Sequence, residues 1–193
     1  MARERKRPLS PERALERALT RKARPPSAPG GAAEQLRALE ERYGREGARQ
    51  RLGLSERQLR RWRAGTTGRP LPANAERLRR ETERLRRESA INARREARLR
   101  NRGAYVHMTG EMGGGTPGAK RTNSRHRSIG GRGETSIHLT ETQMNEITNL
   151  YQAGNDDQAL EVLREAIADQ YGWGSFHFED LTLLEFLRDD PNE

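Results

Sequence analysis

The stretch RLGLSERQLRRWRAG, residues 51–65, is typical of the centre of a helix-turn-helix. Gly53 can adopt the positive φ that a tight turn between two helices requires. Ser55 and Gln58 have the spacing of a capping box, which predicts that a helix begins directly after Ser55. The preceding segment REGARQRL supplies the first helix, so the sequence predicts two helices joined at residues 53–55.

The apolar residues around this turn predict a three-helix core. They are Leu36, Leu39, Ala48, Leu52, Leu54, Leu59 and Trp62. Burying them turns the polar face of the second helix outward, and arginine there suits both guanine edges and phosphates. The predicted DNA-binding residues are Ser55, Glu56, Arg57, Gln58, Arg60, Arg61 and Arg63. The alternative is a solvated arginine face on an ordinary helical bundle.

Charge is distributed unevenly along the 193 residues, whose net charge is +9. Residues 1–103 carry 30 Lys/Arg against 13 Asp/Glu, whereas residues 104–193 carry 7 against 15. A basic half of this size suits a polyanion, of which nucleic acid is the commonest. An Arg-rich composition inherited from a GC-rich genome is the alternative explanation.

A long basic helix is predicted over residues 74–102, with Asn74 as its cap and Gly103 at its end. It carries 11 arginines and 5 glutamates. Several Glu/Arg pairs lie three or four residues apart, so it can be a salt-bridged exposed helix. Its excess positive charge favours contact with phosphates, which would position the protein on DNA without reading sequence.

The expected fold class is α+β, with an all-α helix-turn-helix domain and its long basic helix followed by a small α+β domain. The expected parts are an N-terminal helix and linker (1–31), the DNA-binding domain (32–102), central strands with a Gly-rich basic loop (103–140) and an acidic α+β part (141–193). Strands are predicted at 104–109, 136–140 and 176–178. Residues 111–134 have the composition of a long mobile loop or hairpin crossing.

No catalytic or metal-binding pattern emerges, so the sequence predicts no enzyme, no metal and no cofactor. There is no cysteine, and GGGTPGAK (113–120) lacks the spacing of a phosphate-binding P-loop. The four histidines (107, 126, 138 and 177) have no metal-ligand spacing. Without a membrane-length apolar run or a secretory signal, a cytoplasmic, nucleoid-associated protein is expected.

The order of these parts resembles the telomere-capping terminal proteins of linear actinomycete replicons. The resemblance lies in a RALERALTR helix, an AEQLRALEERYG helix leading into RLGLSERQLRRW, an Arg-rich helix and a GAYVHMT strand. The SIHLT strand, a helix ending in YQAG and the terminal FHFEDLTLLEFL follow in the same order.

This resemblance implies a protein that becomes covalently attached to 5′ DNA ends. In that family a hydroxyl in the loop between the central strands accepts the first deoxynucleotide and so primes the DNA synthesis that patches the end. By position, the candidate hydroxyls are Ser128 and Thr135, then Thr122 and Ser124. The implied partners are telomeric DNA with a single-stranded overhang, a telomere-associated helper protein and a DNA polymerase; no membrane is implied.

A helix-turn-helix transcriptional regulator of a plasmid, phage or mobile element is the alternative function. Its acidic C-terminal part would form a homodimer on a palindromic site. A third alternative is an architectural protein without site preference, whose binding would depend steeply on salt.

Overall fold

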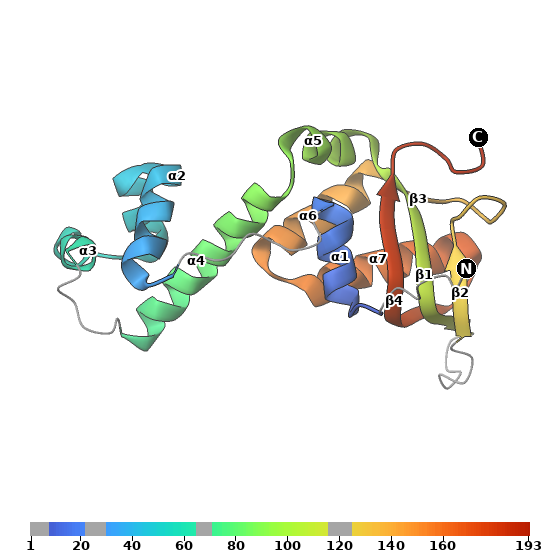
Figure 1. The fold of residues 1–193 in the computed structure, drawn as a ribbon, viewed down its shortest axis with the longest axis horizontal. Helices are drawn as coiled ribbons and strands as arrows, with labels where there is room; N and C mark the ends of the chain where they lie inside the picture. The colour runs from blue at the N-terminus through green and yellow to red at the C-terminus, as the bar shows by residue number, and fades with distance from the viewer. Residues whose placement is uncertain (1–7, 22–29, 65–70, 116–124) are drawn as a thin grey trace, which may run out of the picture. The chain divides into compact units, whose positions relative to one another are not determined.

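The computed structural model describes residues 8–21, 30–64, 71–115 and 125–193 (Figure 1). They contain seven helices and a four-stranded antiparallel sheet, which confirms the α+β class. The helices are α1 (Pro11–Thr20), α2 (Ala32–Leu52), α3 (Glu56–Arg63), α4 (Pro72–Ala90), α5 (Ala93–Arg102), α6 (Glu141–Ala153) and α7 (Asp156–Tyr171). The strands are β1 (Ala104–Gly115), β2 (Arg125–Ile129), β3 (Ile137–Leu139) and β4 (Ser175–Leu187).

The chain forms two compact units. Residues 25–90 form one, called here the helical unit, and residues 1–24 with 91–193 form the other, called the sheet unit. These units divide the chain differently from the ranges expected from the sequence. Residues 91–102 belong to the sheet unit, where Ile91 and Leu99 join the core, and the expected parts 103–140 and 141–193 share one sheet.

The single helix expected over residues 74–102 is wrong. The chain leaves α4 at Ala90 and starts α5 at Ala93. Between them Asn92 is extended (φ −63°, ψ 130°), and its side-chain oxygen accepts hydrogen bonds from the backbone N–H groups of Arg94 and Arg95. An asparagine that caps a new helix in this way ends the one before it.

The helical unit is built around the predicted core. Gly44 (φ 72°, ψ 168°) interrupts α2, so helical segments lie on both sides of it, as the sequence predicts for residues 33–43 and 45–52. All seven apolar residues predicted for the core are buried, and Leu78 of α4 joins them. The α4 helix packs along α2 and contributes Leu78, although only the three preceding helical segments were expected to form the core.

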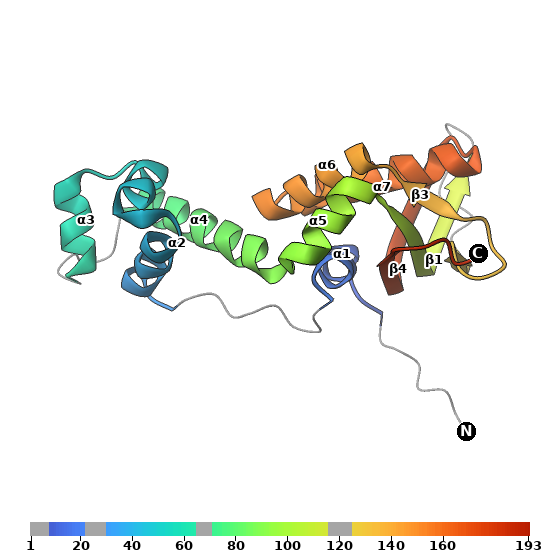
Figure 2. The same cartoon turned by 90° about the horizontal axis from the view of Figure 1, so that it is seen from above.

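In the sheet unit, β1 is the central strand. Along one edge it pairs with β4, and along the other it pairs first with β3 and then with β2. The helices α6 and α7 cover one face of the sheet, and the apolar side chains of that face form the core with them (Figure 2). The α1 helix packs against β4, and Leu9 forms two backbone hydrogen bonds with Leu181 on the outer edge of β4.

The Gly-rich segment is more ordered than predicted. Strand β1 continues to Gly115 and β2 begins at Arg125, so both flanks of the expected loop 111–134 form a hairpin; residues 116–124 lie outside the described ones. A Cβ on Gly110 would overlap the carbonyl oxygen of Asp180, and one on Gly114 would overlap the ring of Trp173. Glycine is needed at these two positions because neighbouring atoms lie close to the β1 backbone, and not because the backbone must be flexible.

The C-terminal strand is also longer than predicted. The expected strand at 176–178 extends as β4 to Leu187, through the segment DLTLLEFL. Two register shifts, one on each side of Gly110, make the pairing of β1 with β4 irregular around Leu181. Across the described ranges, no helix is long and apolar enough to cross a membrane.

Candidate nucleic-acid interface

A tight turn sets the start of α3. Gly53 has φ 61° and ψ 34°, and the Arg77 guanidinium lies where a Cβ at position 53 would point. Arg77 Nη1 donates to the Leu52 carbonyl at 2.8 Å, which satisfies an oxygen at the end of α2. The turn therefore depends on glycine and on an arginine from α4.

Ser55 and Gln58 form the predicted capping box. The Ser55 hydroxyl accepts from the Gln58 backbone N–H at 3.3 Å, and Gln58 Oε1 accepts from the Ser55 N–H at 2.9 Å. In this structure their side chains fix where α3 begins. That both residues also contact DNA stays a prediction.

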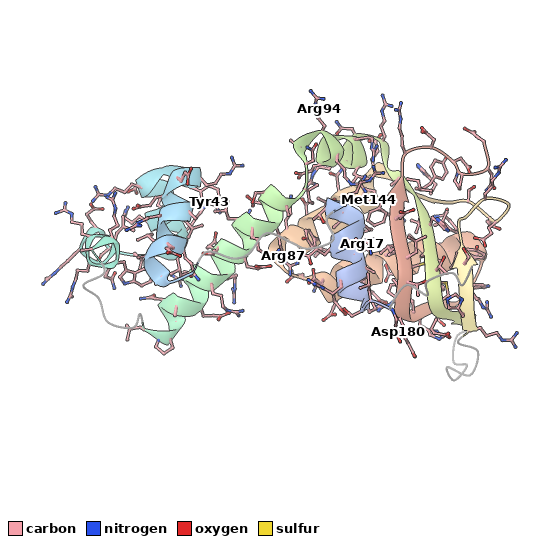
Figure 3. The ribbon with its side chains drawn as sticks, viewed as in Figure 1. Arg17, Tyr43, Arg87, Arg94, Met144 and Asp180 are labelled. Atoms are coloured by element: carbon pink, nitrogen blue, oxygen red, sulfur yellow. The ribbon has the colours of Figure 1, made fainter. Side chains whose placement is uncertain are left out.

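The arginines of α3 form its exposed face. Nitrogen-ended side chains project from this helix away from the rest of the helical unit (Figure 3). Arg57 and Arg61 are exposed, and Arg57 has no ion-pair partner in the described ranges of the chain. Arg60 is 72% exposed and lies 3.3 Å from Glu56. The opposite face carries Leu59 and Trp62, which are buried.

The remaining predicted contact residues are ion-paired. Glu56 pairs with Arg45 as well as with Arg60. Arg63 Nε lies 3.2 Å from Glu40 Oε2 of α2, so this arginine ties α3 to its neighbour. Because Glu56 pairs with Arg45 as well as with Arg60, an arginine from α2 lies beside the exposed face of α3.

The arginines of α4 are largely committed to glutamates of the same helix. Arg79 pairs with Glu76, Arg84 with Glu88, and both Arg86 and Arg87 with Glu83. The hydrogen bond from Arg86 is the main cause that lowers the pKa of Glu83. This arrangement favours the salt-bridged interpretation of the helix over continuous contact with phosphates.

Tyr43 links α2 to this ion-pair array. Its hydroxyl donates to Glu88 Oε2 at 2.9 Å, and the Arg51 guanidinium lies 4.0 Å from its ring centroid. Burial is the main cause that raises the pKa of Tyr43, and its bond to Glu88 raises it further. The α2–α4 contact is thus polar at its rim and apolar at Leu78.

The candidate hydroxyls lie in different surroundings. Ser128 is exposed on β2, Thr135 is exposed in the turn between β2 and β3, and Thr122 and Ser124 lie outside the described residues. The Thr135 turn is tied to the C-terminal segment: Gly133 N–H donates to Asn192 Oδ1 at 2.6 Å, and Asn192 Nδ2 donates to the Glu134 carbonyl at 2.7 Å. Burial raises the pKa of Tyr171, and the neighbouring Thr135 hydroxyl partly offsets this rise.

Ser128 has a histidine beside it that sequence reasoning missed. Its Oγ lies 3.5 Å from His107 Nε2 and accepts from Thr109 Oγ1 at 3.4 Å. His107 Nδ1 in turn lies 3.9 Å from Glu185 Oε2 on β4. All four side chains occupy the sheet face opposite α6 and α7, because Thr109 pairs with Ser128 and His107 pairs with Glu185.

This cluster is a hydroxyl, an imidazole and a carboxylate arranged in sequence. The imidazole can accept a proton from the hydroxyl, and the carboxylate lies near the other ring nitrogen but beyond hydrogen-bond distance. The four histidines do not gather: among the residues that the structure describes, no three His, Asp or Glu side chains lie together as metal ligands would.

No family model, curated protein or solved structure matches this chain.

Proposed function

We propose that the protein binds DNA through a helix-turn-helix formed by the second half of α2 and by α3. Three exposed arginines, Arg57, Arg60 and Arg61, would contact bases or phosphates. The observation that carries this proposal is the arrangement of α3. A capping box fixes its start, Leu59 and Trp62 are buried on one face, and arginines occupy the face toward solvent. The basic, salt-bridged α4 would support this unit and add positive field near the DNA.

We further propose that the protein is a terminal protein of linear replicons, with Ser128 as the priming hydroxyl. Ser128 is preferred over Thr135 because an exposed hydroxyl beside an imidazole can give up its proton, whereas the Thr135 turn is tied to Asn192. The resemblance in the order of sequence elements supports this assignment.

The proposed reaction joins Ser128 to a deoxynucleotide. Ser128 Oγ forms a bond to the α-phosphorus of a deoxynucleoside triphosphate, the bond between the α- and β-phosphates breaks, and pyrophosphate leaves. The hydroxyl proton passes to His107 Nε2. A DNA polymerase would supply the metal ions and extend the bound nucleotide, and the acidic sheet unit would contact that polymerase and the helper protein.

The test is transfer of labelled nucleotide to the protein. The full chain is incubated with each α-labelled deoxynucleoside triphosphate, a telomeric 3′-overhang template and host extract, and label on the protein is measured. Wild type and Ser128→Thr should be labelled, and Ser128→Ala should lose the label. Thr135→Ala is the matched control and should retain it.

The same experiment distinguishes the priming function from the alternative function. Absence of label, under conditions in which a known terminal protein is labelled, would contradict the priming proposal. Dimeric binding to a palindromic site would then support the helix-turn-helix regulator.

A further inference from the structure

A pocket in the sheet unit is lined by arginines that the proposed function does not use. It has a volume of about 430 Å³ and lies between α1, the side chain of Arg95 from α5, and the outer edge of β4. Figure 1 shows α1 beside β4, and Figure 3 labels Arg17 on that helix. A pocket of this volume is in the range of small-molecule sites.

The wall of the pocket is strongly positive. Arg17, Arg21 and Arg95 line it, and Glu185 is its one acidic lining residue. Arg17 lies in the last turn of α1 and Arg21 directly follows that helix, and both side chains line the pocket. In the described ranges neither of these two has an ion pair. Glu185 offsets only part of this positive charge, and the rest is left for a ligand to balance.

Arg95 is a fixed member of this wall. Its Nε donates to the Leu19 carbonyl at 2.9 Å, and its Nη2 donates to the Ala18 carbonyl at 2.5 Å. These bonds cap the end of α1 but bring no carboxylate into contact with the guanidinium. Burial, followed by repulsion from Arg21 and Arg98, lowers the pKa of Arg95 to about 10.

Arg98 adds positive charge near Arg95, although it does not line the pocket. Its Nη2 is buried and has no hydrogen-bond partner in the part of the chain that the structure describes. Buried donors are nearly always satisfied, so an open donor close enough to repel Arg95 leaves positive charge uncompensated near the pocket. The repulsion that Arg98 and Arg21 exert on Arg95 would fall if an anion lay among them.

Arg21 has an unfavourable backbone conformation. Its φ is +56°, and it is the only non-glycine residue with positive φ in the described ranges. It follows the last residue of α1, where glycine is the usual choice because glycine has no Cβ. An arginine retained in a strained conformation at a pocket wall is a reason to look for a function of its side chain.

We propose that this pocket binds a phosphate group, carried by a free nucleotide or by a DNA strand, through Arg17 and Arg21, with Arg95 as a fixed positive charge. Planar guanidinium groups match phosphate oxygens and can bind them in pairs. The site belongs to the sheet unit, whereas the α3 arginines belong to the helical unit, and it does not rest on the proposed function.

The first test measures the affinity of the full chain for pyrophosphate by isothermal titration calorimetry. Arg17→Gln should weaken binding about tenfold, because one phosphate-binding guanidinium is lost. Arg13→Gln is the matched control on the same helix, where Arg13 pairs with Glu16 and does not line the pocket. It should change the affinity by less than about twofold.

A second variant separates binding from folding. Arg21→Gly relieves the positive φ and should raise the melting temperature of the sheet unit, yet it should weaken pyrophosphate binding about tenfold. A variant that is more stable but binds less well excludes unfolding as the cause. Pyrophosphate that fails to bind wild type at about 10 mM, or that binds both variants as tightly as wild type, would overturn the proposal.

The source of the phosphate is identified by two further probes in the same titration. Tighter binding of deoxyadenosine triphosphate assigns the site to a free nucleotide. Tighter binding of a dithymidine phosphodiester assigns it to a DNA strand. Arg17→Gln and Arg21→Gly leave α3 unchanged, so binding that both variants weaken is assigned to the pocket, whatever the outcome for DNA binding by α3.

Discussion

The helical unit and the sheet unit are stabilised in different ways. In the described residues the helical unit carries 15 Arg against 9 Glu, and the sheet unit carries 13 Arg against 18 Asp and Glu. The helical unit buries 9 apolar residues and the sheet unit 27, a larger share of its length. We infer that ion pairs and caps matter more in the helical unit, whereas packing matters more in the sheet unit.

This contrast can be measured because each unit has one tryptophan. Trp62 lies in the core of the helical unit, and Trp173 stacks on Tyr171 and Phe176 in the sheet unit. The chain has only these two. Trp173→Phe leaves a reporter of the helical unit, and Trp62→Phe leaves a reporter of the sheet unit.

The largest expected effect is in the sheet unit. Phe186→Ala removes a fully buried ring from β4 and should cost about 3–5 kcal/mol of unfolding free energy. The unfolding transition reported by Trp173 should move to a lower denaturant concentration, and the transition reported by Trp62 should not move. An equal shift of both transitions would show that the units unfold as one, and would break the comparison.

The turn before α3 should be the most sensitive backbone position in the helical unit. Gly53→Ala places a Cβ at φ +61° and displaces Arg77, so it should cost about 1–2 kcal/mol or more in the Trp62 transition. Gly154→Ala, also at positive φ but with open space around its Cβ, is the matched control in the sheet unit. We expect it to cost less, and equal costs would mean that the Arg77 contact contributes nothing.

The two capping boxes allow a smaller, paired test. Ser55→Ala at α3 and Thr140→Ala at α6 remove equivalent side-chain acceptors. Each should cost about 1 kcal/mol in the transition of its own unit. An effect of Ser55→Ala below about 0.3 kcal/mol would indicate that α3 is positioned by its core contacts alone.

The smallest expected effect is a pH dependence of the helical unit. Hydrogen bonds from Arg49 and Gln50 lower the pKa of Glu46 to about 2, and the bond from Arg79 lowers the pKa of Glu76. A depressed carboxyl pKa gives stability that is present above the ordinary value and is lost as pH falls through the folded value.

The unfolding free energy of the helical unit, followed by Trp62, should therefore be lower at about pH 3 than at pH 7. Glu83, which is part-exposed, should contribute less than about 1 kcal/mol. A Trp62 transition that is independent of pH in this range would contradict a role for these ion pairs.

Much of the helical unit was predictable because its signals are local. The spacing of Ser55 and Gln58 fixes the start of α3, and Gly44 and Gly53 mark where helices end. The break at Asn92 was missed because good helix formers surround it, and only its side-chain bonds to residues 94 and 95 reveal a new cap.

The candidate sites of the sheet unit were harder to predict. Ser128 was singled out by position, but its neighbour His107 depends on the register of β1 with β2 and β4. Arg95 meets Arg17 and Arg21 across more than 70 residues of sequence. The i,i+4 spacing of Arg17 and Arg21 was the one local signal of that pocket.

The central claim, that DNA recognition lies in α3, is tested most directly by a mobility-shift titration of the full chain. Arg57→Gln with Arg60→Gln is compared with Arg13→Gln and Arg188→Gln, two exposed arginines of the sheet unit. The α3 pair should weaken binding at least about tenfold and reduce the salt dependence, and the control pair should stay within about threefold of wild type. Equal losses for the two pairs, or a larger loss for the control, would contradict the account.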